Sequence, residues 1–200
     1  MPSPQLKLVL TALRYAGVAI LFALCGAWSA QFFRMRGGSD RLICTLPLPF
    51  AVLCGLLFIR TVRAILTVPL MVAVWLAAYS AATMVGLQTP NEAYLLPVAV
   101  GGLVGGLGIA LAASICHRGL LSPRHLLAAA LTGCVGALPF GFWLKSYYLH
   151  LGGWPDPLQP VRLQYAFAIW QAAVGTCLYA VCTRAKKKAL PENPEGGHPL

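Results

Sequence analysis

The stretch PVAVGGLVGGLGIALAASIC, residues 97–116, contains five glycines within eight residues and no charged side chain. In water, each glycine would cost a helix about 1 kcal/mol relative to alanine. In lipid, hydrophobic burial does not drive helices together, and small residues at helical spacing let two backbones approach closely. We therefore predict that this segment is a central helix, with a helix-packing groove formed by Gly101, Gly102, Gly105, Gly106 and Gly108.

The composition of the 200-residue chain agrees with a lipid environment. The chain is 58% hydrophobic and only 10% charged, and its mean hydropathy is +0.73. A soluble domain has about a quarter of its residues charged, whereas a membrane-spanning helix needs about 20 apolar residues. We predict an all-α fold, a polytopic integral membrane protein with a six-transmembrane-helix bundle, whose spans cover about 9–33, 44–66, 68–88, 91–116, 124–144 and 162–183.

The six apolar runs take up most of the chain. We therefore expect a single transmembrane domain over residues 1–185, followed by a polar, disordered cytoplasmic tail over 186–200. The first run follows Lys7, as in a signal peptide, but it is much longer than the apolar region of about 7–15 residues that a signal peptide has. This run is expected to be retained as a helix.

The chain has 15 basic and 5 acidic residues, a formal net charge of +10. The basic residues lie mainly between and beyond the apolar runs, where they set membrane topology, so we expect no nucleic-acid partner. The run RAKKK at 184–188 favours a topology with both termini in the cytoplasm. We expect a plasma membrane or a bacterial inner membrane, with membrane lipids and a membrane protein as candidate partners.

Prolines and polar residues indicate where several helices begin. Pro69 is expected to open the third span, so the second would run to about Leu66. Thr89 has the spacing of a helix cap for the fourth span, with Glu92 reaching back to it. The pair SP at 122–123 is expected to cap and open the fifth span.

The second span begins with TLPLPF at 45–50, where Pro47 and Pro49 remove two backbone hydrogen-bond donors. Two interpretations remain open. Residues 42–48 form irregular backbone that protein or water must cover, or the segment is an ordinary helix entry with proline in its first turn.

Gln164 and Gln171 lie on one face of the sixth span. A polar amide in hydrocarbon needs a partner, so Gln171 is predicted to point into the bundle and to bond another helix. Together with Pro47 and Pro49, these two glutamines are the candidate lining of a path through the membrane.

The spans carry no ionisable residue at mid-depth, which removes the usual basis for proton relays, ion paths and carboxylate catalysis. The seven cysteines include no CxxC pair, and free cysteines in spans behave as small apolar residues. No cluster of metal ligands and no nucleophile motif is present. We assign no catalytic residue, no metal ligand and no cofactor, and a protein without enzymatic activity is favoured over an enzyme.

The connection HRGLLSPRH at 117–125 is expected on the inner face of the membrane. Two histidines and two arginines at this place can hold an anion or a lipid headgroup; the alternative is that they only anchor two helix ends. The residues of this candidate site are His117, Arg118, Arg124 and His125.

No single motif assigns a specific function. The favoured interpretation is a membrane component, such as a scaffold, a sensor or an accessory subunit, that binds a partner or a lipid. The alternative is a transporter of small molecules or lipids. Its path would be lined by the glycine groove of 101–108, by Gln171 and by the break at Pro47 and Pro49.

Overall fold

The structure is a computed structural model that describes residues 3–35, 46–58, 64–90, 93–116, 122–149 and 159–189. These residues form six helices and no strand: α1 (Pro4–Met35), α2 (Leu48–Phe58), α3 (Ala64–Gln88), α4 (Leu95–Cys116), α5 (Pro123–Leu149) and α6 (Gln159–Ala189). The predicted all-α fold is confirmed. Helix α6 extends through 186–189, the first residues of the predicted tail, and residues 190–200 lie outside the described part.

The second predicted span is much shorter than expected. Helix α2 has 11 residues and, at about 1.5 Å per residue, is about 16 Å long, half of the roughly 30 Å thickness of a hydrocarbon core. The other five helices are long and apolar enough to cross a membrane. The described part of the chain therefore holds five candidate spans and one short apolar helix, rather than six full spans.

The boundary between the second and third helices also differs from the prediction. Helix α3 begins at Ala64, so the extension of the second helix to Leu66 is wrong, and Pro69 lies inside α3 instead of opening it. A proline removes the hydrogen bond to the carbonyl four residues earlier, which here belongs to Ile65 in the first turn of α3. Because only this one bond near the start is lost, the helix can begin before its proline.

Two predicted helix caps have different outcomes. The Thr89 hydroxyl donates to the Val85 carbonyl at 2.9 Å, at the end of α3, and α4 begins only at Leu95. The capping role predicted for Thr89 is therefore wrong. Its predicted partner Glu92 lies outside the described residues. The cap of α5 is confirmed, since the His125 backbone N–H donates to the Ser122 hydroxyl at 3.4 Å.

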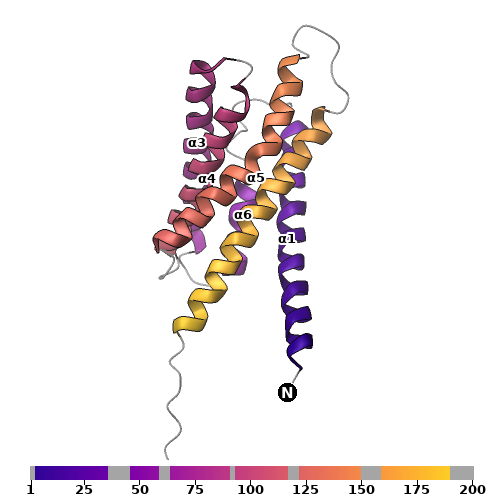
Figure 1. Cartoon of the computed structure of the whole chain (residues 1–200). Coiled ribbons are helices and arrows are strands. Elements are labelled where there is room, and N and C mark those ends of the chain that lie inside the picture. Colours follow the sequence, from indigo (N-terminus) through magenta and orange to yellow (C-terminus); the bar gives the residue numbers. More distant parts are fainter. Residues whose placement is uncertain are drawn as a thin grey trace, which may run out of the picture.

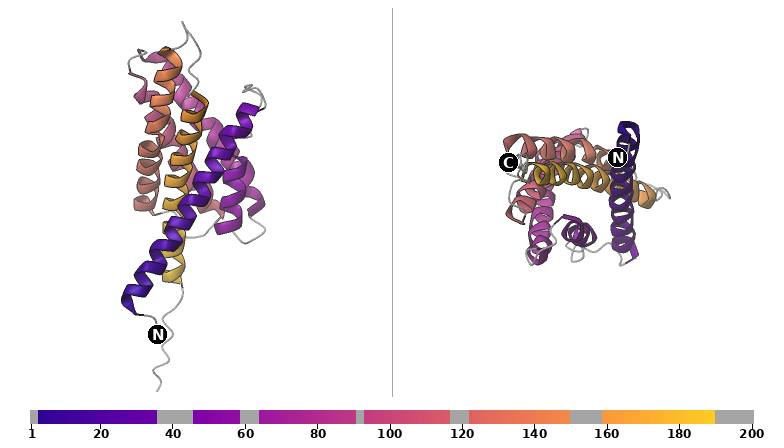
Figure 2. Two further views of the ribbon diagram at one scale, coloured as in Figure 1. Left: turned by 90° about the vertical axis from the view of Figure 1, so that its right-hand side faces the viewer. Right: turned by 90° about the horizontal axis from the view of Figure 1, so that it is seen from below.

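The helices are arranged so that α3, α4, α5, α6 and α1 are neighbours in that order, with the short α2 between α1 and α3 (Figure 1, Figure 2). Helix α6 packs against α1, α2 and α5 and contributes Trp170, Val174 and Leu178 to the core. Helix α4 packs mainly against α3 and α5. Helix α4 is therefore closely packed on two sides, as expected of a central helix, but α6 packs against three helices and shares the central position.

The bundle has two ends. Helices α1, α3 and α5 finish, and α4 and α6 start, at the end that we call the Lys145 end, because this residue lies in the last turns of α5. The start of α1 and the end of α6 both lie at the opposite end (Figure 1). Any ligand that approaches the Lys145 end therefore meets the bundle on the side away from both of these helix ends.

Helices α4 and α5 meet through glycines. A methyl group added at Gly102 would collide with the Gly133 carbonyl oxygen, and one added at Gly133 would lie 2.8 Å from the Gly106 Cα. Glycine at these positions lets the two backbones touch, which is how helices in lipid gain close van der Waals contact. The α4–α5 contact is therefore a contact between backbones rather than between side chains.

The same arrangement recurs between α1 and α6. A methyl group at Gly26 of α1 would collide with the Phe167 carbonyl, and one at Gly175 of α6 would collide with the ring of Phe22. Phe22 is completely buried. Each of the two helices thus contributes one glycine to the contact. At Gly26 the glycine meets backbone, and at Gly175 it meets the side chain of Phe22.

Replacement of Gly106 by alanine is expected to destabilise the protein by about 1–3 kcal/mol, because the added methyl group would collide with the Ala129 carbonyl oxygen and would lie 3.0 Å from the Gly133 Cα. The matched control is Gly17→Ala, since nothing lies within 4 Å of a methyl group at Gly17. Thermal unfolding in mild detergent, followed by circular dichroism, measures both. Equal melting temperatures for the two variants would contradict the backbone contact.

Candidate ligand-binding pocket

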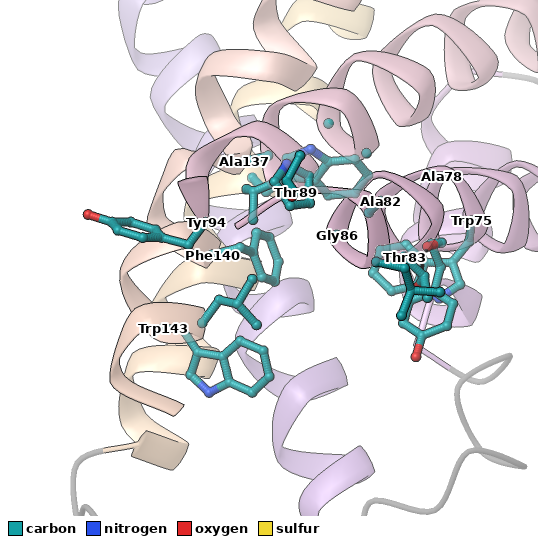
Figure 3. Close-up of a pocket in the computed structure, with 18 of the residues that line it drawn as sticks. Trp75, Ala78, Ala82, Thr83, Gly86, Thr89, Tyr94, Ala137, Phe140 and Trp143 are labelled. Carbon is teal, nitrogen blue, oxygen red and sulfur yellow. Dashed lines mark hydrogen bonds between the residues drawn. The ribbon is translucent and has the colours of Figure 1, made fainter. Parts of the chain in front are cut away.

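A cavity of about 450 Å³ lies between α3, α4 and α5, with one wall from α6 (Figure 3). Its volume falls within the range of about 300–1,000 Å³ that is typical of small-molecule sites. In Figure 3, Phe140 and Trp143 of α5 lie across the cavity from Thr83 of α3. The aromatic residues that line it are Trp75, Tyr79, Tyr94, Phe140, Trp143 and Trp170.

The pocket extends from the Lys145 end to the middle of the bundle. Thr89 and Leu144 line it near the helix ends, whereas Trp75 and Trp170 line its inner part. The 14 residues from Trp75 to Thr89 correspond to about 21 Å along α3, and Trp75 lies near the middle of the candidate span Ile65–Gln88. The pocket therefore extends from the Lys145 end to about the middle of the candidate spans.

The wall of the pocket is almost entirely apolar. None of the described lining residues carries a charge. The hydroxyl of Thr83 already donates to the Tyr79 carbonyl at 2.9 Å, as does that of Thr89 to Val85. The indole Nε1 of Trp75 is buried and has no hydrogen-bond partner among the described residues. Such a wall suits a hydrocarbon chain or another lipophilic group.

Small residues create the space. Ala78, Ala82 and Gly86 follow one another at steps of four along α3, and all three line the pocket. On α4, Gly101 and Gly102 contribute backbone instead of side chain to the opposite wall. The cavity exists because these positions leave unfilled the volume that larger side chains would occupy.

An aromatic cluster closes the inner end of the pocket. The rings of Trp75 and Trp170 lie 6.1 Å apart, edge to face, and the ring of Phe167 lies 5.5 Å from Trp75 and 4.8 Å from Phe140. Edge-to-face and tilted pairs at such distances are favourable and hold ring orientations. The inner wall is thus built from α3, α5 and α6 together.

A lysine stands at the mouth of the pocket. The Lys145 Nζ lies 5.4 Å from the centre of the Tyr94 ring, a distance at which a cation is attracted to the ring face. Tyr94 lines the pocket, as do Trp143 and Leu144 directly before the lysine. In Figure 3 the Tyr94 hydroxyl points away from the other lining residues. Lys145 therefore marks the rim of the pocket without entering it.

The five glycines of the predicted groove face three different neighbours. Gly101 and Gly108 face α3, through Ala82 and Val74. Gly102 and Gly106 face α5, and a methyl group at Gly105 would lie 3.1 Å from the Trp170 ring of α6. Of the five, Gly101 and Gly102 also line the pocket. The glycines thus separate into positions for close helix contact and positions that border the cavity.

Apart from Gly101 and Gly102 of the glycine groove, the predicted path residues do not line this pocket. Pro47 is buried in a turn before α2, with its carbonyl accepting from the Ala51 N–H at 2.9 Å, and Pro49 lies in the first turn of α2. Pro49 also borders a shallow apolar groove beside Trp28. Of the segment 42–48, the structure describes residues 46–48, and residues 42–45 lie outside the described part. The described residues show a helix entry with proline in the first turn.

The two glutamines of α6 differ in their partners. The Gln164 Nε2 donates to the Gln31 Oε1 of α1. Gln171 is only 1% exposed, and its Oε1 has no hydrogen-bond partner among the described residues. The hydrogen bond between helices that was predicted for Gln171 is therefore made by Gln164, which lies about two helical turns nearer the Lys145 end.

The candidate anion site on the opposite end is described only in part. His117 and Arg118 lie outside the described residues. Arg124 is exposed and His125 is half-buried in the first turn of α5. The described residues contain no group of three or more side chains that could hold a metal ion.

Sequence reasoning did not single out the pocket. The residues missed are Trp75, Tyr79, Phe140 and Trp170 on three helices, together with the small residues of α3. One signal was present: Ala78, Ala82 and Gly86 share a helix face, as Gly102 and Gly106 of the predicted groove do. That pattern indicates a small-residue face but does not show whether a helix or a cavity lies against it.

Replacement of Gln164 by leucine is expected to cost about 0.6–2 kcal/mol, the usual contribution of a hydrogen bond between helices in lipid, because it leaves the Gln31 amide without its partner. Unfolding in mild detergent measures the loss. In the double variant with Gln31→Leu, the total loss should be smaller than the sum of the two single losses. Additive losses would show that the two amides do not interact.

Comparison with known proteins found no matching family model, no similar curated protein and no similar solved structure.

Proposed function

We propose that this protein is a non-enzymatic membrane component, a sensor or an accessory subunit, that binds a lipid or another lipophilic molecule in the pocket between α3, α4, α5 and α6. The observation that supports this proposal is the pocket itself, about 450 Å³ with an aromatic, uncharged wall among the described residues. The basic run at 184–188 supports the further proposal that both termini face the cytoplasm of a plasma or bacterial inner membrane.

The position of the pocket favours entry from the bilayer. Tyr79 and Leu87 line it, and they are 46% and 80% exposed on the outer surface of α3. In a membrane, apolar residues exposed at this depth face lipid. A lipophilic ligand can therefore move from the bilayer into the pocket without crossing water.

The lining favours binding over chemistry. The polar groups that the described wall contributes are hydroxyls of threonine and tyrosine and indole N–H groups. Acid–base catalysis most often uses histidine, a carboxylate or lysine, and none of these side chains lines the pocket among the described residues. The wall instead resembles sites in which apolar and aromatic side chains hold a ligand and few polar groups orient it.

The proposal is tested by filling the pocket. Gly86→Phe adds a ring to a lining residue whose added Cβ would be in ordinary contact, 3.7 Å from Pro97. Gly17→Phe is the matched control, since the space around Gly17 is open. We expect wild-type protein and the control, purified in mild detergent, to carry the same bound lipophile by mass spectrometry, and Gly86→Phe to lose most of it. Equal amounts in all three proteins would contradict the proposal.

One observation favours transport as a second candidate function. The inner wall of the pocket includes Trp170, and the next residue, Gln171, carries a buried amide oxygen without a described partner. A path from the pocket past Gln171 would reach the opposite end of the bundle. Gln171→Leu should then abolish movement of the bound lipophile across proteoliposomes while leaving its binding intact. Unchanged transfer in this variant would argue against the candidate.

A further inference from the structure

We infer that the pocket takes an anionic amphiphile with one long hydrocarbon chain in the cavity, and that its acidic headgroup pairs with the Nζ of Lys145. This inference rests on the proposed function and names the ligand class. The shared chemistry is a negative charge at the membrane surface joined to a chain of about 20 Å. Both a free fatty acid and an anionic phospholipid have it.

The first argument is the charge at the mouth. Lys145 is exposed, and its described contact is the face of the Tyr94 ring. The described side chains include no carboxylate, since all aspartates and glutamates of the sequence lie outside the described ranges. A lysine ammonium over an aromatic ring can still donate its N–H groups to an anion on its open side.

The second argument is the separation between charge and cavity. The lysine lies at the rim, whereas the lining from Leu144 inward to Trp75 and Trp170 is uncharged among the described residues. A ligand that is charged throughout would have to bury its charge against aromatic walls, which is costly. A ligand that is wholly apolar would leave the lysine unused. An amphiphile satisfies both regions in one orientation.

The third argument is depth. The lining along α3 extends from Thr89 to Trp75, about 21 Å of helix. Half of a hydrocarbon core is about 15 Å thick. A chain whose headgroup lies at the membrane surface therefore has its far end beside Trp75 and Trp170, without drawing the headgroup into the hydrocarbon.

The test uses the full-length protein in nanodiscs of phosphatidylcholine, with palmitate as the anionic probe and hexadecanol as the neutral probe of the same chain length. We expect Lys145→Gln to raise the Kd of palmitate about five-fold, which corresponds to one basic residue at a membrane surface, and to leave hexadecanol unchanged. Lys145→Arg should keep wild-type affinity. Lys7→Gln is the matched control, because Lys7 is exposed at the opposite end of the bundle.

Two further measurements locate the chain and identify the source. A dibrominated fatty acid should quench tryptophan fluorescence in wild-type protein, and less in Gly86→Phe, because three tryptophans line the pocket. Nanodiscs that contain phosphatidylglycerol should weaken palmitate binding if the bilayer supplies the anion. Weakening supports an anionic phospholipid as the occupant, and its absence supports a free fatty acid.

The outcomes separate this inference from the proposed function. If palmitate and hexadecanol bind equally and Lys145→Gln changes neither, the pocket is a site for neutral lipophiles and the inference is wrong, while the proposed function stands. If neither probe binds and Gly86→Phe changes nothing, both are wrong. Because Lys145 is exposed, Lys145→Gln is expected to melt at the wild-type temperature. Weaker palmitate binding in this variant would therefore result from the lost charge and not from unfolding.

Discussion

Contact between bare backbones is the constraint on which the rest of this structure depends. In lipid, apolar side chains gain little by touching one another instead of acyl chains, so helices associate where their backbones come close. Gly102 and Gly106 of α4 do this with Gly133 of α5, and Gly26 of α1 does it with α6. Gly102, which touches α5, also lines the cavity. The same run of glycines therefore allows close helix packing at some positions and leaves open space at others.

The helical class and most spans could be predicted because membrane helices are long apolar runs with charged or turn residues between them. The start of α5 at Ser122 and Pro123 could also be predicted, since a cap depends on neighbouring residues alone. The length of α2 could not, because no glycine or proline stands between Phe58, the last residue of α2, and Ala64, the first residue of α3, to mark a boundary in the sequence. Thr89 misled for a related reason: its hydroxyl bonds equally well to the helix before it.

The candidate site was harder to predict than the fold. A cavity is defined by side chains that are absent, and this one is shared by helices far apart in sequence, so no local motif marks it. The glutamines show the same limit. Both Gln164 and Gln171 lie on a face that turns inward, but only Gln164 lies opposite Gln31. A helical wheel gives the direction of a side chain and does not give the register of the helix it meets.

The short α2 has a consequence for the surrounding bilayer. A helix of about 16 Å between two full-length neighbours covers only part of the depth on that side of the molecule. Just before it, Leu46 and Pro47 form a buried turn, in which Leu46 packs against Ala30 and Phe167. Among the described residues, the apolar wall on this flank is therefore thinner than around the rest of the bundle, and a bilayer beside it would have to adapt. A change in membrane thickness should therefore alter the hydrophobic mismatch first at the flank formed by α2.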